Sequence, residues 1–187
     1  MLFAIEHLEE NLSEWLLIEY SHAAKIAGRE NMVITNVTDE EDFRKLSKIA
    51  KVERASVREV LSNKRLIVLD PQAKRCLSPV DGKADAVVVG GILGDYPPRH
   101  RTSKLLTKFL PGAKARNIGK FQLSIDGAVY VAKEILGGRR LEEIPMIFGL
   151  EIEASRKHSV YLPYAYPLVD GKPLISCELV NYLKRKG

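Results

Sequence analysis

The chain has 187 residues, of which 45% are hydrophobic, so it is long enough to bury the core of one globular domain. Its formal net charge of +5 permits a polyanionic partner without requiring one, because many solvated protein surfaces are equally basic. No apolar run approaches the roughly 20 residues of a membrane-spanning helix, and residues 1–10 lack the pattern of a secretory signal. Cys76 and Cys177 form no C-x-x-C pair, which favours a reducing compartment. We therefore expect a cytoplasmic protein without membrane contact.

The first third of the sequence alternates apolar runs with segments that carry helix signals. Residues 2–7 and 32–37 are expected strands. In a capping box, a small polar residue and a glutamate three positions later satisfy each other's backbone amides. We expect three such boxes: Asn11 with Glu14, Thr38 with Glu41, and Ser56 with Glu59. The first opens a helix that ends at Gly28, and because this helix is apolar nearly all round, other elements should cover more than one of its sides.

The rest of the chain predicts a mostly parallel sheet. The runs RLIVLD (65–70) and ADAVVVGG (84–91) lack strict alternation, as is typical of strands buried on both faces. Further expected elements are a helix over 103–110, an extended piece over 114–119, a helix capped by Ser124, two later strands and a helix over 176–186. The predicted fold class is therefore α/β, a mostly parallel sheet flanked by helices, with ligands bound beyond the carboxyl ends of the strands.

The most unusual stretch is GGILGDYPPRHRT, Gly90 to Thr102, which follows a predicted strand. It has neither the Gly-Lys-Ser/Thr ending of a P-loop nor G-x-G-x-x-G spacing. Pro97 and Pro98 keep the preceding residues out of helical geometry, so no helix can begin directly on the glycines and direct its dipole at a pyrophosphate. The stretch is either a rigid loop whose backbone approaches a flat ligand or a tight turn without one. Two further loops, 69–74 and 117–124, should meet it at the same edge of the sheet and form a pocket.

Four segments of the chain resemble the SPOUT class of S-adenosylmethionine-dependent methyltransferases: IEHLEENLSEWLLIEYS, LDPQAKRCLSP, GGILGDYPPRHRT and RNIGKFQLSIDGAV. Within this class the chain is most similar to the subfamily of the eukaryotic ribosomal-protein arginine methyltransferase and its archaeal relatives described as RNA methyltransferases. The resemblance implies a SPOUT-like fold with a C-terminal trefoil knot. It covers the chain almost to its end, where YLKRKG stands in place of the acidic tail of eukaryotic members, and this difference leaves the acceptor open.

The resemblance also implies S-adenosylmethionine as cofactor, held by three loops of the knot. We expect its adenine to lie among apolar side chains, with backbone groups hydrogen-bonded to the edge of the base. The implied cofactor-binding residues are Leu69, Asp70, Pro71, Gly90, Gly91, Ile92, Leu93, Gly94, Ile118, Gly119, Gln122, Leu123 and Ser124. A bulky residue in place of Gly91 is expected to abolish cofactor binding and leave the fold largely intact.

Glu19 and Asp95 are the candidate catalytic residues. Methyl transfer from a sulfonium depends mainly on positioning, and an arginine acceptor also needs carboxylates to balance its charge and remove a proton. Glu19 lies on the apolar first helix, where an unpaired carboxylate is costly to bury, so a structural ion pair competes with a substrate role. Asp95 either holds the acceptor or bonds its own backbone in the turn.

Glu6, Arg99 and Arg101 are the candidate substrate-binding residues. The two arginines can hold a phosphate group if the acceptor is RNA. If the acceptor is a protein, they can instead pair with the glutamate-rich start of the chain and hold the loop. The four histidines are scattered without metal-ligand spacing, so we expect no metal.

The resemblance implies an S-adenosylmethionine-dependent methyltransferase. It makes an arginine of a small-subunit ribosomal protein the first candidate acceptor, and ribosomal or transfer RNA is the second. A noncatalytic ribosome- or RNA-binding module is the alternative of a different class. We expect residues 1–187 to form a single domain, in which residues 1–64 contribute to the acceptor site and residues 65–187 bind the cofactor. We expect a monomer or a homodimer.

Overall fold

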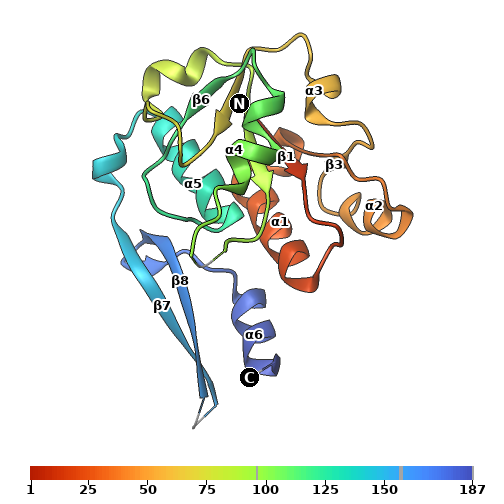
Figure 1. Cartoon of the computed structure of the whole chain (residues 1–187). Coiled ribbons are helices and arrows are strands. Elements are labelled where there is room, and N and C mark those ends of the chain that lie inside the picture. Colours follow the sequence, from red (N-terminus) through yellow and green to blue (C-terminus); the bar gives the residue numbers. More distant parts are fainter. Residues whose placement is uncertain (96, 156–157, 187) are drawn as a thin grey trace.

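The computed structural model describes residues 1–95, 97–155 and 158–186, and it contains a six-stranded parallel sheet (Figure 1). The strand order is β3-β2-β1-β5-β4-β6, and every neighbouring pair is parallel. The strands are β1 (Leu2–His7), β2 (Met32–Thr35), β3 (Lys51–Val52), β4 (Leu66–Leu69), β5 (Ala86–Gly91) and β6 (Lys114–Arg116). The predicted α/β class with a mostly parallel sheet is confirmed.

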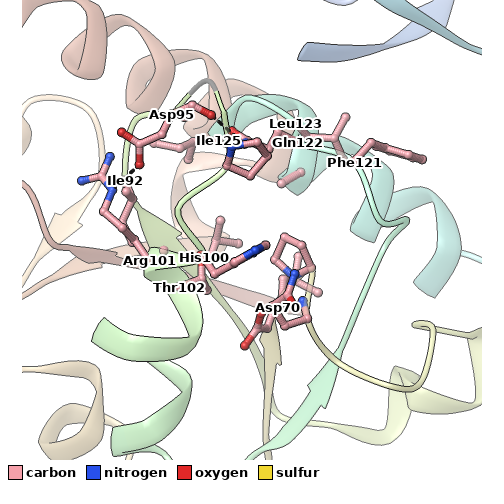
Figure 2. A pocket seen from close by; sticks show the side chains of 18 of the residues that line it. Asp70, Ile92, Asp95, His100, Arg101, Thr102, Phe121, Gln122, Leu123 and Ile125 are labelled. Atoms are coloured by element: carbon pink, nitrogen blue, oxygen red, sulfur yellow. Dashed lines mark hydrogen bonds and ion pairs between the residues drawn. The ribbon is translucent and has the colours of Figure 1, made fainter. Parts of the chain in front are cut away.

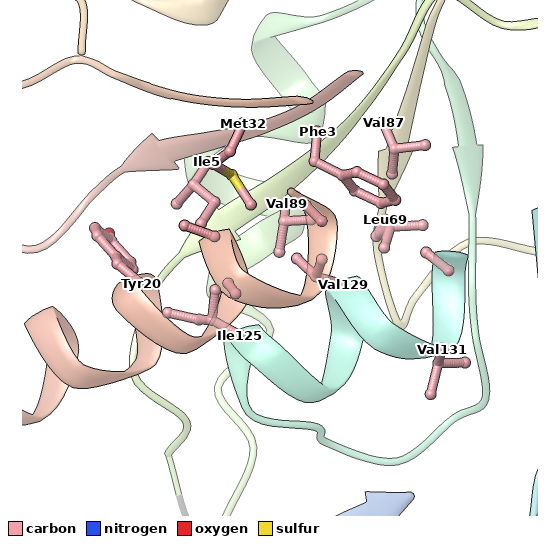
Figure 3. Close-up of a cluster of buried hydrophobic side chains, with 14 of the residues drawn as sticks. Phe3, Ile5, Tyr20, Met32, Leu69, Val87, Val89, Ile125, Val129 and Val131 are labelled. Carbon is pink, nitrogen blue, oxygen red and sulfur yellow. The ribbon is translucent and has the colours of Figure 1, made fainter. Parts of the chain in front are cut away.

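Helices cover both faces of this sheet, which explains why its central strands are continuously apolar. On one face, Ile5 and Val89 pack in a cluster with side chains of α1 (Glu14–Ala27) and α5 (Ile125–Leu136) (Figure 3). On the other face, Ala4 and Val88 pack in a second cluster with residues of α3 (Val57–Val60) and residues just after α4 (Arg101–Leu105). The short helix α2 (Glu40–Leu46) leads into β3.

A separate antiparallel sheet forms the carboxyl-terminal part of the fold. It consists of β7 (Met146–Ser155), β8 (His158–Val169) and β9 (Lys172–Pro173), and α6 (Cys177–Lys186) follows it. Ile18 of α1 shares a buried cluster with residues of β7, β8 and α6. The helix α1 is therefore covered on two sides, as its composition predicts. The sequence predicts the two long strands but not their separation from the parallel sheet.

Helix caps are the least accurate part of the prediction. Ser124 caps α5 as expected, with its Oγ accepting from the Gly127 amide at 3.3 Å. The predicted caps Asn11 and Thr38 are wrong, because Ser13 caps α1 and Asp39 caps α2. In both places a second residue able to cap lies within two positions, so the local signal is ambiguous. Ser56 does cap α3, although its Oγ accepts from the amide of residue 58.

The predicted helix over 103–110 is shorter in the structure. α4 covers Arg101–Leu105, and a 3-10 turn over Thr107–Phe109 follows it. Both pieces lie beside the carboxyl end of β4, where the predicted ligand loops meet. Within the described part of the chain, no helix is long and apolar enough to cross a bilayer. The trefoil knot stays a prediction of the resemblance.

Candidate active site

A cavity of about 180 Å³ lies at the carboxyl edge of the parallel sheet, and we call it the main cavity (Figure 2). Three segments line it: residues 69–72 after β4, residues of the 89–102 stretch around the end of β5, and residues 118–125 leading into the first turn of α5, which also contributes Ala128. All of the predicted cofactor-binding residues line it except Gly91. The three loops that the sequence predicts to converge therefore do converge.

Gly91 lies outside the main cavity and faces the core. A Cβ atom at this position would lie 2.0 Å from the Tyr20 hydroxyl oxygen and 2.8 Å from the Glu6 carbonyl oxygen. The glycine is thus required for close packing of β5 against α1 and β1. The prediction that a bulky residue here leaves the fold intact is wrong, because the clash is with buried groups.

The first loop is fixed by Asp70, whose carboxylate accepts hydrogen bonds from other groups of the protein. Its Oδ2 accepts hydrogen bonds from Ser103 Oγ and Thr107 Oγ1, both at 2.7 Å. Its Oδ1 accepts from the Gln72 amide at 2.8 Å. Asp70 therefore lines the main cavity and also links the end of β4 to α4, and the second of these roles was not visible in the sequence.

The second loop is held by Arg101. Its guanidinium donates to Asp95 Oδ2 at 2.7 Å (Figure 2). It also donates to Glu9 Oε1 at 3.0 Å and to the Leu93 carbonyl oxygen at 2.6 Å. Of the two roles predicted for Arg101, pairing with the glutamate-rich start of the chain is the one that the structure contains. Asp95 pairs with Arg101, and its carboxylate accepts no hydrogen bond from its own turn among the described residues. Arg99 is exposed at the rim of the main cavity.

Glu6 does not lie in the site. Its carboxylate accepts hydrogen bonds from Thr35 Oγ1, from Ser56 Oγ at 2.6 Å and from the Val57 amide at 2.8 Å. The side chain is buried, and these contacts join β1 to the ends of β2 and α3. The prediction of a substrate-binding role is therefore wrong, because the carboxylate is satisfied inside the fold.

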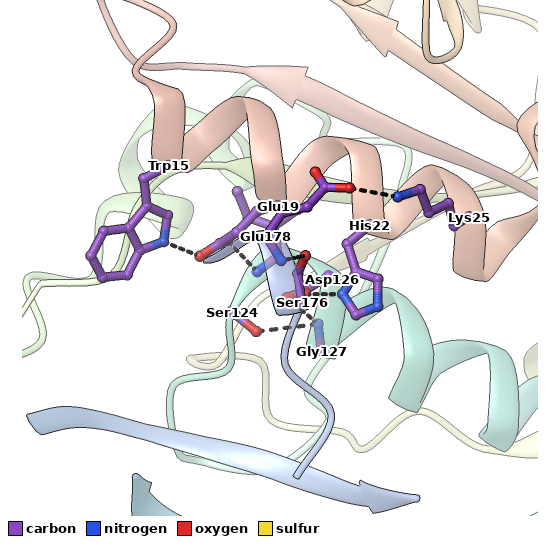
Figure 4. Close-up of polar contacts among 10 residues, drawn as sticks. Trp15, Glu19, His22, Lys25, Ser124, Asp126, Gly127, Ser176 and Glu178 are labelled. Atoms are coloured by element: carbon purple, nitrogen blue, oxygen red, sulfur yellow. Dashed lines mark hydrogen bonds and ion pairs between the residues drawn. The ribbon is translucent and has the colours of Figure 1, made fainter. Parts of the chain in front are cut away.

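Glu19 is buried, and it bonds to neutral donors instead of a cation. It accepts from Trp15 Nε1 at 2.6 Å and from the Ile125 amide at 2.9 Å (Figure 4). Burial, and then the nearby charge of Asp126, raises the pKa of Glu19 to about 7. Asp126 itself contacts His22 Nδ1 at 2.5 Å. No ion pair to Glu19 forms among residues 1–95, 97–155 and 158–186, so the predicted structural ion pair is not found.

A smaller cavity of about 140 Å³ lies beside Glu19, and we call it the side cavity. Trp15, Glu19 and Tyr164 line it together with five residues that also line the main cavity: Ile92, Leu93, Gly94, Leu123 and Ser124. A Cβ atom at Gly94 would lie 2.5 Å from the Tyr164 ring, so the second loop packs tightly on β8. Glu19 therefore lies beside the main cavity, and the residues that line both cavities separate it from that cavity.

Trp15 and Tyr164 are site residues that the sequence prediction missed. Trp15 lies four residues before Glu19 on α1, so the same helical face that singles out Glu19 also carries the indole. Tyr164 lies on β8, whose approach to the second loop depends on a contact 70 residues apart in sequence, from the Tyr164 hydroxyl to the Gly94 carbonyl oxygen at 2.9 Å. No local signal gives such a contact.

The walls of the main cavity fit S-adenosylmethionine. Leu69, Ile92, Ile118 and Leu123 supply apolar surface for a flat base, and Gly90 and Gly94, which carry no side chain, allow a ligand to approach the backbone closely. No group of three or more metal-ligating side chains occurs in the part of the chain that the structure describes.

Comparisons with known proteins agree with this geometry. Residues 2–187 match the family described as SFM1-like protein arginine N-methyltransferase. The chain is 32% identical to the protein arginine N-methyltransferase SFM1 of Saccharomyces cerevisiae, over 99% of this chain and 95% of that protein.

Solved structures give the same result. The structure superposes on yeast SFM1 complexed with SAM with a TM-score of 0.88 and 31% identity, over 99% of this chain and 90% of that one. It superposes on the dual-specific Trm10 of Thermococcus kodakaraensis with a TM-score of 0.63 and 16% identity, over 76% of this chain and 95% of that one, and this shows a shared fold alone. The predicted SPOUT-like fold is thereby confirmed, and the chain belongs to the SFM1-like family of protein arginine N-methyltransferases.

Proposed function

We propose that this chain is an S-adenosylmethionine-dependent methyltransferase whose acceptor is an arginine side chain of a protein. Membership of the SFM1-like family over residues 2–187 supports the reaction. The observation that carries the acceptor is the Glu19 carboxylate, which is buried without a cationic partner among the described residues and faces a cavity beside the main cavity. A guanidinium is the cation that such a carboxylate lacks.

The main cavity is the proposed cofactor site. Leu69, Ile92, Ile118 and Leu123 would enclose the adenine, and the glycine backbone would bond its edge. When bound, S-adenosylmethionine supplies a methyl group on a positively charged sulfur, which a nitrogen lone pair can take because the sulfur leaves as a neutral thioether. The three loops hold this geometry and restrict water, and positioning is most of what the reaction requires.

The side cavity is the proposed acceptor site. Glu19 balances the charge of the arginine and accepts the proton that its nitrogen must lose before or during methyl transfer. A pKa of about 7 suits this task, since a base acts best when its pKa is near the working pH. Trp15 holds one carboxylate oxygen in place and offers its ring to the guanidinium face. Asp95, which is tied to Arg101, positions the second loop between the two cavities.

The two portions of the chain divide these tasks in the proposed enzyme. Residues 1–64 contribute Trp15 and Glu19 to the acceptor site, and residues 65–187 supply the three cofactor loops. We further propose that the enzyme acts in the cytoplasm, as a monomer or homodimer, on a small-subunit ribosomal protein. The resemblance of the four segments to the eukaryotic ribosomal-protein arginine methyltransferase supports the acceptor, and the reducing-compartment pattern of the two cysteines supports the cytoplasm.

The decisive experiment supplies ribosomes of the source organism with S-adenosylmethionine labelled in its methyl group. The RNA and protein fractions are counted separately, and the labelled protein is hydrolysed to identify the modified amino acid. We expect label in one small-subunit protein as methylarginine. Label confined to RNA would contradict the arginine acceptor, and absence of label together with absence of heat release on titration with S-adenosylhomocysteine would contradict the methyltransferase itself.

A further inference from the structure

The positive charge of the chain is concentrated in one segment. Residues 71–124 contain ten Lys and Arg and only three Asp, a net charge of +7, whereas the other 133 residues carry 19 Lys and Arg against 21 Asp and Glu, a net charge of −2. This segment includes most of the three cofactor loops. The excess positive charge of the chain therefore comes from this segment and not from the chain as a whole.

The three acids of this segment are already neutralised by arginines. Asp81 pairs with Arg116, Asp85 with Arg65, and Asp95 with Arg101. Eight basic side chains remain, all of them exposed and none in an ion pair within the described part of the chain. They are Lys74, Arg75, Lys83, Arg99, Lys104, Lys108, Lys114 and Lys120.

Six of these eight lie on or next to the segments that line the main cavity, and we call Lys74, Arg75, Arg99, Lys104, Lys108 and Lys120 the basic rim. Arg99 and Lys120 line the cavity directly. Lys74 ends the first loop and Arg75 follows it, and this segment is bound to the third loop by the Asn117 amide donating to the Arg75 carbonyl oxygen at 2.9 Å. Lys104 and Lys108 each follow one of the two hydroxyl residues that hold Asp70.

The rim has no part in binding the acceptor that we propose. The arginine is bound in the side cavity, at the Glu19 carboxylate, whereas the rim lies at the loops of the main cavity. Uncompensated positive charge of this density suits an anionic partner. Phe109 adds to this surface, because the residue is 49% exposed and the Lys108 ammonium lies 5.7 Å from the centre of its ring. Exposed rings among basic side chains are typical of single-stranded nucleic acid sites, where bases stack and phosphates pair.

We propose that the basic rim and Phe109 bind RNA as a docking partner, so that the enzyme recognises its protein acceptor within a ribonucleoprotein. The RNA is bound and is not methylated. This inference rests on the proposed function only in leaving the side cavity to the arginine acceptor, and its test needs neither cofactor nor acceptor.

The test measures binding of a fluorescein-labelled oligouridine to the full chain by fluorescence anisotropy at a series of salt concentrations. With six phosphate contacts, the logarithm of the association constant should fall against the logarithm of salt concentration with a slope of about −4. The variant Lys74→Glu/Lys104→Glu/Lys108→Glu removes three contacts, so its slope should be about −2 and its affinity at low salt at least tenfold weaker. None of these lysines lines the main cavity, so titration with S-adenosylhomocysteine should give the wild-type result.

The control variant is Lys48→Glu/Lys64→Glu/Lys172→Glu, which makes the same change in net charge at exposed lysines outside the rim. It should bind oligouridine like the wild type. Equal weakening by the two variants would overturn the proposal, because overall charge would then explain the binding. Binding absent at low salt would overturn it as well, and so would displacement of the RNA by poly-glutamate at equal charge, which would make an acidic protein the partner.

Discussion

Glu19 is the residue on which the proposed chemistry depends, and it gives the first prediction. Glu19→Gln keeps an oxygen for the Trp15 indole and removes the group that takes the proton, so kcat for methyl transfer should fall by about 10²- to 10⁴-fold. The wild-type kcat should rise with pH up to about 7 and then level off, because only the ionised carboxylate accepts a proton. This rise should be absent in the variant. Steady-state rates between pH 5 and pH 9 test both expectations.

Binding of S-adenosylhomocysteine provides the control for this residue. Glu19 lines the side cavity and not the main cavity, so calorimetric titration should give the same affinity for the variant and the wild type. A variant that retains full kcat would show that the proton leaves by another route.

At the scale of the structural element, the second loop depends on one side chain from the start of α4. Arg101 joins Glu9, Leu93 and Asp95 at once, and charge-assisted hydrogen bonds of this kind contribute roughly 1.5–3 kcal/mol each. Arg101→Ala should therefore weaken S-adenosylhomocysteine binding by about tenfold or more, since the loop must be ordered on binding. Titration calorimetry measures the loss, and the thermal midpoint Tm shows whether the fold is kept.

Arg101→Lys is the matched variant for the loop. Lysine retains the charge but not the planar guanidinium, so it can donate to only some of the three acceptors. This variant should therefore bind S-adenosylhomocysteine with intermediate affinity. If both variants bind like the wild type, the loop is held by contacts other than Arg101.

At the scale of the whole molecule, the raised pKa of Glu19 should make the free energy of unfolding depend on pH. Its pKa is raised from 4.5 to about 7, so between these values the folded protein holds the proton more tightly than the unfolded chain. By linkage, this group lowers stability as pH rises through that window. The stability of the wild type relative to Glu19→Gln should fall by about 3 kcal/mol between pH 4 and pH 8. Urea unfolding at the two pH values measures the difference, and parallel curves for the two proteins would contradict it.

Local sequence signals predicted the elements of this fold better than their contacts. The strands and the Ser124 cap follow from apolar runs and a single well-placed hydroxyl residue. The contacts that decide function join residues far apart: Glu19 bonds the amide of Ile125, 106 positions away, and Arg101 bonds Glu9, 92 positions away. Spacing along the chain cannot reveal such partners, so the sequence identified Glu19 as unusual but favoured an ion pair for it.

The same limit explains the errors at Glu6 and Gly91. An acid near the start of the chain and a glycine in a glycine-rich turn both resemble site residues. Each is instead required by packing against elements that come from elsewhere in the sequence, α3 for Glu6 and α1 for Gly91. The main cavity was predictable because a specific family pattern covers all three of its loops.

The strand order has a consequence for how the chain is made. β1 is a central strand, and its partner β5 pairs Leu2 with Ala86 through His7 with Gly91. During translation the first strand therefore leaves the ribosome with one edge unpaired, and that edge stays open until about half of the chain has been synthesised. Because parallel pairing across such distances is slow and exposes strand edges, nascent chains arrested before residue 86 should be protease-sensitive and aggregation-prone, whereas chains extended beyond α5 should be protected.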